Sequence, residues 1–122
     1  MEPGELPGKE QADIASGGEA LLVLITSASQ EEAEKIARQL VEERLAACVN
    51  IVPQVRSLFW WENKLSEEEE VLLIVKTRRS RFSALGLRVK ALHSYRVPEI
   101  IALPILEGSA SYLQWIDEST RS

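Results

Sequence analysis

The sequence predicts a single α+β domain, and three observations support that fold class. The chain has 122 residues, which is enough to bury one hydrophobic core but not two. Residues 21–26 and 71–77 are short apolar runs of the kind found in strands that are covered on both faces. Each run is followed by a segment with apolar residues at helical intervals, so strands and helices alternate along the chain.

The first half of the chain predicts a strand, a helix and a long hairpin. After the strand at residues 21–26, Ser29 and Glu32 have the spacing of a capping box, and a helix with a regular apolar face follows. Residues 47–61 are rich in β-branched and aromatic side chains, which predicts a strand. A turn near residues 62–66 leads through four glutamates at 67–70 to the strand at 71–77. We therefore expect a long hairpin with the glutamates at its tip.

The second half supplies one more helix, one more strand and a terminal helix. Ser80 is placed to cap the second helix, in which Gly86 costs about 1 kcal/mol relative to alanine. Residues 100–105 form the last strand, and Gly108 and Ser109 open a short helix. The resulting order, βαββαβ plus a C-terminal helix, is the ferredoxin-like split βαβ arrangement. In this arrangement the first and third strands are central, and the second and fourth lie at the edges, where prolines are tolerated.

The second predicted strand is too long for such a sheet. It spans fifteen residues, 47–61, whereas its predicted neighbours span six or seven, so it must overhang the sheet. The overhanging part carries Phe59, Trp60 and Trp61, and a bare aromatic edge strand is prone to aggregate. We therefore expect this segment to be covered by another subunit.

The composition limits the classes of partner. Residues 1–20 hold five acidic residues and one basic residue, so the rest of the chain is nearly neutral despite the overall charge of −5. A neutral domain gives no reason to expect nucleic acid or a membrane as a partner. Cys48 is the only cysteine, which fits a reducing, cytoplasmic location. Residues 1–19 lack a signal-peptide pattern, so we expect a disordered N-terminal tail before a domain at residues 20–122.

Three segments resemble the CutA family of small trimeric proteins. They are residues 44–53 (RLAACVNIVP), 59–62 (FWWE) and 90–104 (KALHSYRVPEIIALP), and the similarity extends over residues 21–116. The resemblance implies a homotrimer of ferredoxin-like subunits whose long hairpins pair with one another, and a role in tolerance of divalent cations. No complete catalytic constellation is found in the sequence. We therefore expect a protein that is not an enzyme and that requires no cofactor.

His93 is the only histidine, and it lies near the end of the second predicted helix, a few residues before Glu99. From the residues alone it is a metal ligand, an acid/base group or a helix-terminal histidine stabilised by the helix dipole. The resemblance favours a metal role, although Ser94 replaces the family's usual proline and Ile25 replaces its thiol on the first strand. We therefore expect at most weak binding of copper(II) (Cu²⁺), with His93 and Glu99 as metal ligands. The resemblance also implies a cleft between subunits that is lined by Trp61, Lys76 and Tyr95.

Other conspicuous residues have plainer explanations. Cys48 has apolar neighbours in the sequence, as a buried structural cysteine does. The glutamates at 67–70 lack the glycine and alternating ligands of a calcium loop, which indicates a solvated surface. Residues 76–96 hold seven basic residues and no acidic one, which is typical of a solvated helix face or of a pocket for a small anion.

The anion pocket defines an alternative function. In that alternative the chain is a PII-like regulatory module whose small anionic ligand is held by Lys76 and the arginine-rich segment 78–81. A third possibility, a hydrolase of the acylphosphatase type, would need a phosphate-binding loop with an arginine after the first strand. Residues 25–29 contain neither, so this possibility is excluded.

Overall fold

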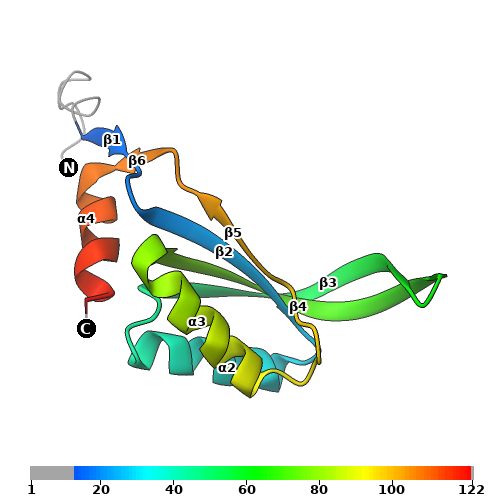
Figure 1. Ribbon diagram of the computed structural model, residues 1–122. Coiled ribbons are helices and arrows are strands. Elements are labelled where there is room, and N and C mark those ends of the chain that lie inside the picture. The colour runs from blue at the N-terminus through cyan, green and yellow to red at the C-terminus, as the bar shows by residue number, and fades with distance from the viewer. Residues whose placement is uncertain (1–12, 122) are drawn as a thin grey trace.

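A computed structural model describes residues 13–121, and its main element is a four-stranded antiparallel sheet (Figure 1). The strands are β2 (Ala20–Ser27), β3 (Cys48–Trp61), β4 (Lys64–Arg78) and β5 (Ile100–Pro104), in the spatial order β3-β4-β2-β5. Helices α2 (Gln30–Glu42) and α3 (Arg79–Leu92) pack on one face of the sheet. The remaining elements are β1 (Ile14–Ser16), β6 (Glu107–Ser109) and α4 (Ala110–Ser119). The predicted ferredoxin-like order is confirmed, with the first and third predicted strands, β2 and β4, in the centre.

The hydrophobic core lies between the sheet and helices α2 and α3. Alternate residues of the central strands point toward the helices, because successive side chains of a strand lie on opposite faces. Val23, Ile25, Leu73 and Val75 are completely buried there. The helix residues that meet them are Ala33, Ile36, Leu40, Leu85 and Val89. Among the described residues, no helix has both the length and the apolar character needed to cross a membrane.

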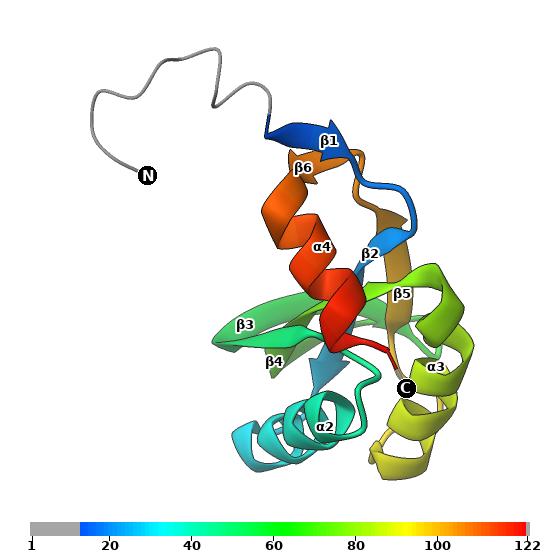
Figure 2. The ribbon, with the colours of Figure 1, turned by 90° about the vertical axis from the view of Figure 1, so that its left-hand side faces the viewer.

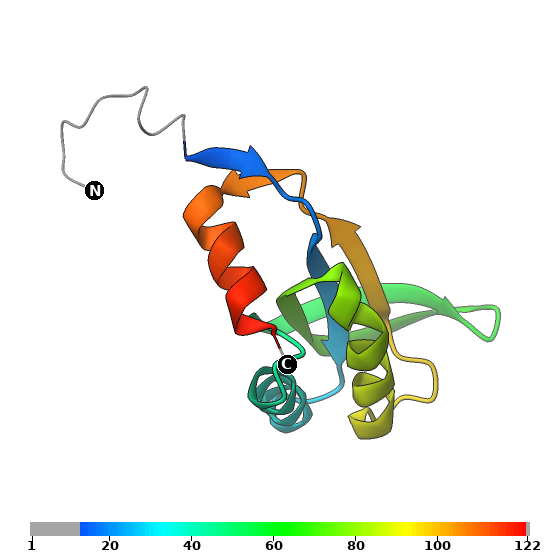
Figure 3. The ribbon, with the colours of Figure 1, turned by 60° about the vertical axis from the view of Figure 1, so that its left-hand side comes forward.

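The opposite face of the sheet, which we call the second face, carries another set of apolar side chains. Leu22 pairs with Leu103 and Leu24 pairs with Ile101 across β2 and β5, and Ile74 of β4 is the other partner of Leu24. Helix α4 lies at one end of this face, against the starts of β1 and β2 and the end of β4 (Figure 3). Ile101 and Leu103 are 51% and 45% exposed. Much of the second face is therefore uncovered within residues 13–121.

Strands β3 and β4 continue beyond the other strands as a two-stranded hairpin that projects from the body (Figure 1). Its turn consists of Glu62 and Asn63, whose φ angles of 49° and 63° are left-handed, so Trp61 pairs with Lys64. Such a two-residue turn matches the twist of a hairpin. Two expectations are therefore wrong. The glutamates at 67–70 lie within β4 rather than at the tip, and β4, with 15 residues, overhangs as far as β3, with 14.

A β-bulge interrupts the pairing of β3 with β4 between Val52 and Val55. Gln54, inside the bulge, has a φ of 59°, and Pro53 precedes it. The missing N–H of Pro53 breaks no inner hydrogen bond, because β3 is an edge strand. The pairing of β4 with β2 ends at Val71. The bulge therefore marks the root of the hairpin, where it leaves the sheet.

The predicted end of the N-terminal tail at residue 19 is wrong. Strand β1 pairs with β6, and Asp13 accepts hydrogen bonds from Ala110 N and from Ser109 Oγ (2.7 Å). This small ribbon holds the start of α4 (Figure 2). The sequence does not indicate the strand, because it is only three residues long and its partner lies near the other end of the chain. The part of the predicted tail at residues 1–12 lies outside the described residues.

Between β1 and β2 the chain crosses the segment that links β5 to β6. Gly17 N donates to Leu106 O (2.8 Å), and Ile105 N donates to Ala20 O (3.1 Å). A Cβ atom on Gly17 would lie 1.5 Å from Ile105 O. Only glycine therefore fits at this crossing.

The predicted cap of α2 is confirmed, and that of α3 is wrong. Ser29 caps α2 by accepting from a backbone N–H of the first turn (3.1 Å), and Ser109 caps α4. Ser80 does not cap α3, because this helix already begins at Arg79. Arg79 N donates to Glu19 O (2.8 Å), so a contact with the backbone before β2 serves the start of the helix in place of a side chain.

Candidate functional site

His93 lies at the C-terminal end of α3, and its side chain is completely buried. Its Nε2 is 2.7 Å from Thr26 O. Because a carbonyl oxygen can only accept, we assign the ring hydrogen to Nε2. Its Nδ1 accepts a hydrogen bond from Tyr95 N (2.9 Å). Both ring nitrogens are therefore engaged inside the protein, and the ring is assigned as the neutral Nε2–H tautomer.

Glu32, in the first turn of α2, holds the segment that follows His93. Its Oε1 accepts from Ser27 Oγ (2.7 Å), and its Oε2 accepts from Ser94 N (2.8 Å). Oε1 also lies 3.8 Å from His93 Nδ1. Burial alone would raise the pKa of Glu32, but the hydrogen bonds from Ser27 and Ser94 outweigh it, and the pKa is lowered from its usual value. The carboxylate is therefore held in its charged form.

Tyr95 connects this group to the hairpin. Its ring centroid is 4.8 Å from that of His93, and its hydroxyl donates to Glu70 Oε2 (2.8 Å). Glu70 is buried at the root of the hairpin. Burial, the hydrogen bond to Glu70 and the negative charges of Glu70, Glu68 and Glu32 together raise the pKa of Tyr95 to about 12. The phenol therefore stays protonated and remains a hydrogen-bond donor.

Lys76 lies on the second face, away from these residues. Its ammonium contacts Asn50 Oδ1 and lies 3.9 Å from Cys48 Sγ. Cys48 is half-buried rather than fully buried as expected. The reason is that Cys48 begins an edge strand and is the register partner of Lys76. Its side chain therefore lies on the second face and not in the core.

The other predicted site residues are also separate in the single chain. Trp61 is at the hairpin turn and is 60% exposed. Glu99 is exposed in the segment before β5, and within residues 13–121 it forms no hydrogen bond or ion pair with His93 or Tyr95. The structure therefore brings His93 and Tyr95 together and leaves Trp61, Lys76 and Glu99 apart. The structure adds three residues to the network around His93 and Tyr95, namely Ser27, Glu32 and Glu70. Of these, only Glu32 has a signal in the sequence, which is its spacing from the helix cap Ser29.

A tight metal centre is not formed by one subunit. Within residues 13–121 there is no group of three or more His, Cys, Asp or Glu side chains placed to hold a metal ion. Both nitrogens of His93 are engaged, and Ile25 is completely buried in the core. Structural and catalytic metal sites usually need at least three protein ligands. The residues present therefore do not fit a resident metal in the single chain.

Two arginines of the basic run, together with Arg44, bind the C-terminal end of α4. Arg81 Nε donates to Thr120 O (2.7 Å), Arg78 Nε donates to Thr120 Oγ1 (2.9 Å), and Arg44 donates to Ser119 O (3.2 Å). Carbonyl groups at this end of a helix lack intrahelical donors and carry the negative end of the dipole. These arginines are therefore accounted for without an anionic ligand.

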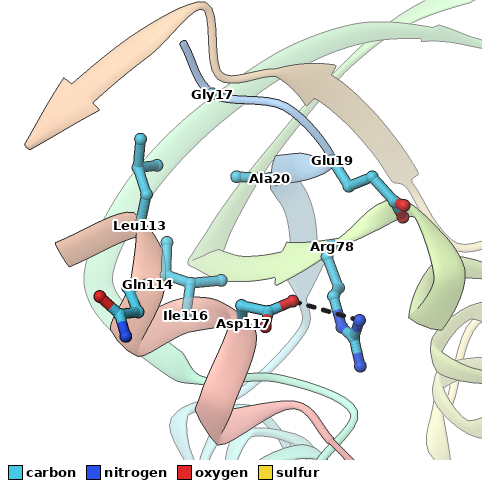
Figure 4. Close-up of a pocket in the computed structure, with 8 residues that line it drawn as sticks. All are labelled: Gly17, Glu19, Ala20, Arg78, Leu113, Gln114, Ile116 and Asp117. Carbon is cyan, nitrogen blue, oxygen red and sulfur yellow. Dashed lines mark hydrogen bonds and ion pairs between the residues drawn. The ribbon is translucent and has the colours of Figure 1, made fainter. Parts of the chain in front are cut away.

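A pocket of about 310 Å³ lies beside this cluster, between α4 and the start of β2 (Figure 4). Ala20, Leu113 and Ile116 supply its apolar lining. Arg78 borders it and is turned toward Asp117, with which it forms an ion pair (3.2 Å). The guanidinium group is already engaged, so we assign no ligand to this pocket.

Fold and site together define a class of protein: a small ferredoxin-like subunit with a partly uncovered sheet face, a projecting hairpin and a buried network around a histidine. The sequence family described as "CutA1 divalent ion tolerance protein" matches residues 21–119. The chain belongs to the CutA1 family.

Relatives extend this result. The divalent-cation tolerance protein CutA of Thermus thermophilus is 57% identical over 99 residues, which are 81% of this chain and 96% of the relative. The solved structure of the divalent cation tolerance protein Cut A1 from Thermus thermophilus has a TM-score of 0.82 at 55% identity and covers 84% of this chain and 99% of that one. Protein CutA 1, chloroplastic, of Oryza sativa is 48% identical over 84% of this chain, which spans 58% of that longer relative. The family description and the names of the two Thermus thermophilus matches refer to divalent-cation tolerance.

Proposed function

We propose that the chain acts in the tolerance of divalent cations as a homotrimer. The observation that carries the assembly is the apolar surface that one chain leaves in water. Leu58, Trp60 and Leu65 on the hairpin are 61%, 76% and 66% exposed, in addition to the uncovered second face. Contiguous apolar surface on a subunit marks an interface, and a long edge strand such as β3 offers unpaired backbone groups to a partner. Sedimentation analysis tests this, and a stable monomer at micromolar concentration would contradict it.

The position of Trp61 supports a cleft between subunits. Trp61 is six residues beyond Val55, the register partner of Glu70. At about 3.3 Å per residue, it lies about 20 Å along the hairpin from the root, where Glu70 meets Tyr95. Trp61 therefore cannot close over Tyr95 of its own subunit. In the proposed assembly, the hairpin of a neighbouring subunit supplies the tryptophan.

Direct copper(II) binding at His93 is weak in this proposal. A metal at Nδ1 must displace the hydrogen bond from Tyr95 N, and Ile25 offers no sulfur ligand. Glu99 is the second proposed ligand, and its exposure leaves it able to move. Copper(II) is preferred over zinc by imidazole-containing sites in general.

Copper titration by calorimetry tests the metal part of the proposal. The wild type is compared with His93→Ala and with Cys48→Ala, which removes the only thiol of the chain. We expect His93→Ala to lose binding and Cys48→Ala to retain it. Equal binding by His93→Ala and the wild type would place the site elsewhere. If copper does not bind and a small anion binds in a way that depends on Lys76, the PII-like module is favoured instead. That alternative has less support, because Arg78 and Arg81 already form hydrogen bonds with the end of α4.

A further inference from the structure

Glu32 occupies the third position of a capping box but does not complete that motif. Ser29 Oγ accepts from Glu32 N (3.1 Å), which is one half of it. In the other half, the glutamate carboxylate would accept from the backbone N–H of the capping residue. Here both carboxylate oxygens are bonded elsewhere, to Ser27 Oγ and to Ser94 N. Glu32 therefore serves a loop that is 62 residues away in the sequence and not only the end of its own helix.

That loop contains Tyr95 of the proposed cleft and the proposed metal ligand His93. Residues 93–95 are held by three other elements of the fold. The contacts are His93 Nε2 to Thr26 O in β2, Ser94 N to Glu32 in α2, and Tyr95 Oη to Glu70 in β4. Glu32 binds the middle of the loop, and its charge also lies within 3.8 Å of the histidine ring.

We propose that Glu32 is the positioning residue of the loop at 93–95, and that the path from Glu32 through Ser94 and Tyr95 to Glu70 couples the loop to the hairpin. The coupling to assembly rests on the proposed function, in which the hairpin lies in the trimer interface. A shift of Tyr95 breaks its bond to Glu70 and leaves a buried carboxylate without that donor. Because coupling between two sites is reciprocal, assembly that holds the hairpin also holds the loop, and a loosened loop weakens assembly.

The neighbouring residue Glu31 separates this role from helix capping. Glu31 is in the same first turn of α2, where any negative charge is stabilised by the helix dipole, but it is exposed and does not bond the loop. If Glu32 acted only through its charge at the helix start, Glu31→Ala and Glu32→Ala would have the same effect. If Glu32 positions the loop, only Glu32→Ala disturbs residues 93–95.

The test is amide hydrogen exchange of the full chain without metal, with Ser94 N and Tyr95 N as reporters. We expect exchange of both amides to be about tenfold faster or more in Glu32→Ala and unchanged in Glu31→Ala. Glu32→Gln keeps one carbonyl oxygen that can accept from Ser94 N, so we expect partial rescue. Unchanged exchange in Glu32→Ala, or equal changes in both alanine variants, would overturn the positioning role.

A double-mutant cycle on trimer dissociation tests the coupling. Tyr95→Phe removes only the hydroxyl that reaches Glu70, and we expect it to raise the dissociation constant about tenfold in the wild type. In the Glu32→Ala background, where the loop is already loose, we expect a change of about twofold or less. Additive effects would overturn the coupling.

Neither the exchange experiment nor the double-mutant cycle uses copper, so a failed copper titration leaves both tests intact. A chain that sediments as a monomer would refute the proposed assembly and the coupling, and the exchange experiment alone would then decide the role of Glu32.

Discussion

Replacement of Trp60 by alanine should weaken the trimer without unfolding the subunit. Trp60 is 76% exposed in the single chain, so its side chain contributes little to the stability of that chain. A tryptophan covered by a partner buries about 150 to 250 Å². Three quarters of that area, at about 25 cal/mol per Å², corresponds to about 3 to 5 kcal/mol per subunit. Association should therefore weaken by about a hundredfold to a few thousandfold for each interface.

Sedimentation equilibrium over a wide concentration range measures this loss, and circular dichroism reports whether the subunit stays folded. Leu87→Ala is the matched control, because Leu87 is 72% exposed on α3 and does not lie on the hairpin. We expect Leu87→Ala to leave both the dissociation constant and the spectrum unchanged. Equal dissociation constants for the two variants would refute the reasoning, as would a Trp60→Ala subunit that loses its fold.

Two further predictions concern stability. Deletion of residues 1–19 removes β1, and Gly17→Ala forces the chain away from Ile105 O. Both changes should therefore lower the melting temperature by several degrees in a thermal scan. An unchanged melting temperature would show that the β1–β6 ribbon does not contribute to stability. Because folding raises the pKa of Tyr95 from 10.0 to about 12, the protonated phenol stabilises the fold fully below pH 10, and this contribution is lost as pH rises toward 12. Denaturant titrations at several pH values should show that loss in the wild type and not in Tyr95→Phe, and a parallel fall in both would contradict the titration of Tyr95 as its cause.

The order of the elements and the centre of the sheet were predictable because they depend on local patterns. Apolar runs and helical periodicity identify β2, β4 and α2 without reference to the rest of the chain, and Ser29 caps α2 as its spacing indicates. The strand at residues 14–16 was missed because its only support is a pairing with residues 107–109. Glutamate is depleted in strands, so the sequence predicts the glutamates at 67–70 at the hairpin tip and not within a strand. Pairing with β3, including an ion pair between Glu67 and Arg56, overrides that preference.

The candidate site was predictable only in part. His93 and Tyr95 share a recognisable segment, and the structure brings them together. Ser27, Glu32 and Glu70 meet that segment through contacts between residues far apart in the chain, which no local pattern records. Glu32 did have a signal, but the signal indicated a helix cap, and the structure shows a second use of the same carboxylate.

The bulge at residues 53–54 sets the direction in which the hairpin projects from the sheet. One extra residue in β3 bends the strand at the point where it leaves the sheet, and about 20 Å of paired strand extends beyond that bend. A change of about 10° at the bend would move the tip by about 3.5 Å, which is close to the whole distance of a van der Waals contact. The tip carries the most exposed tryptophans of the chain, Trp60 and Trp61. In the proposed trimer, the backbone geometry of Gln54 therefore sets where Trp60 and Trp61 contact the neighbouring subunit, although Gln54 pairs with neither tryptophan.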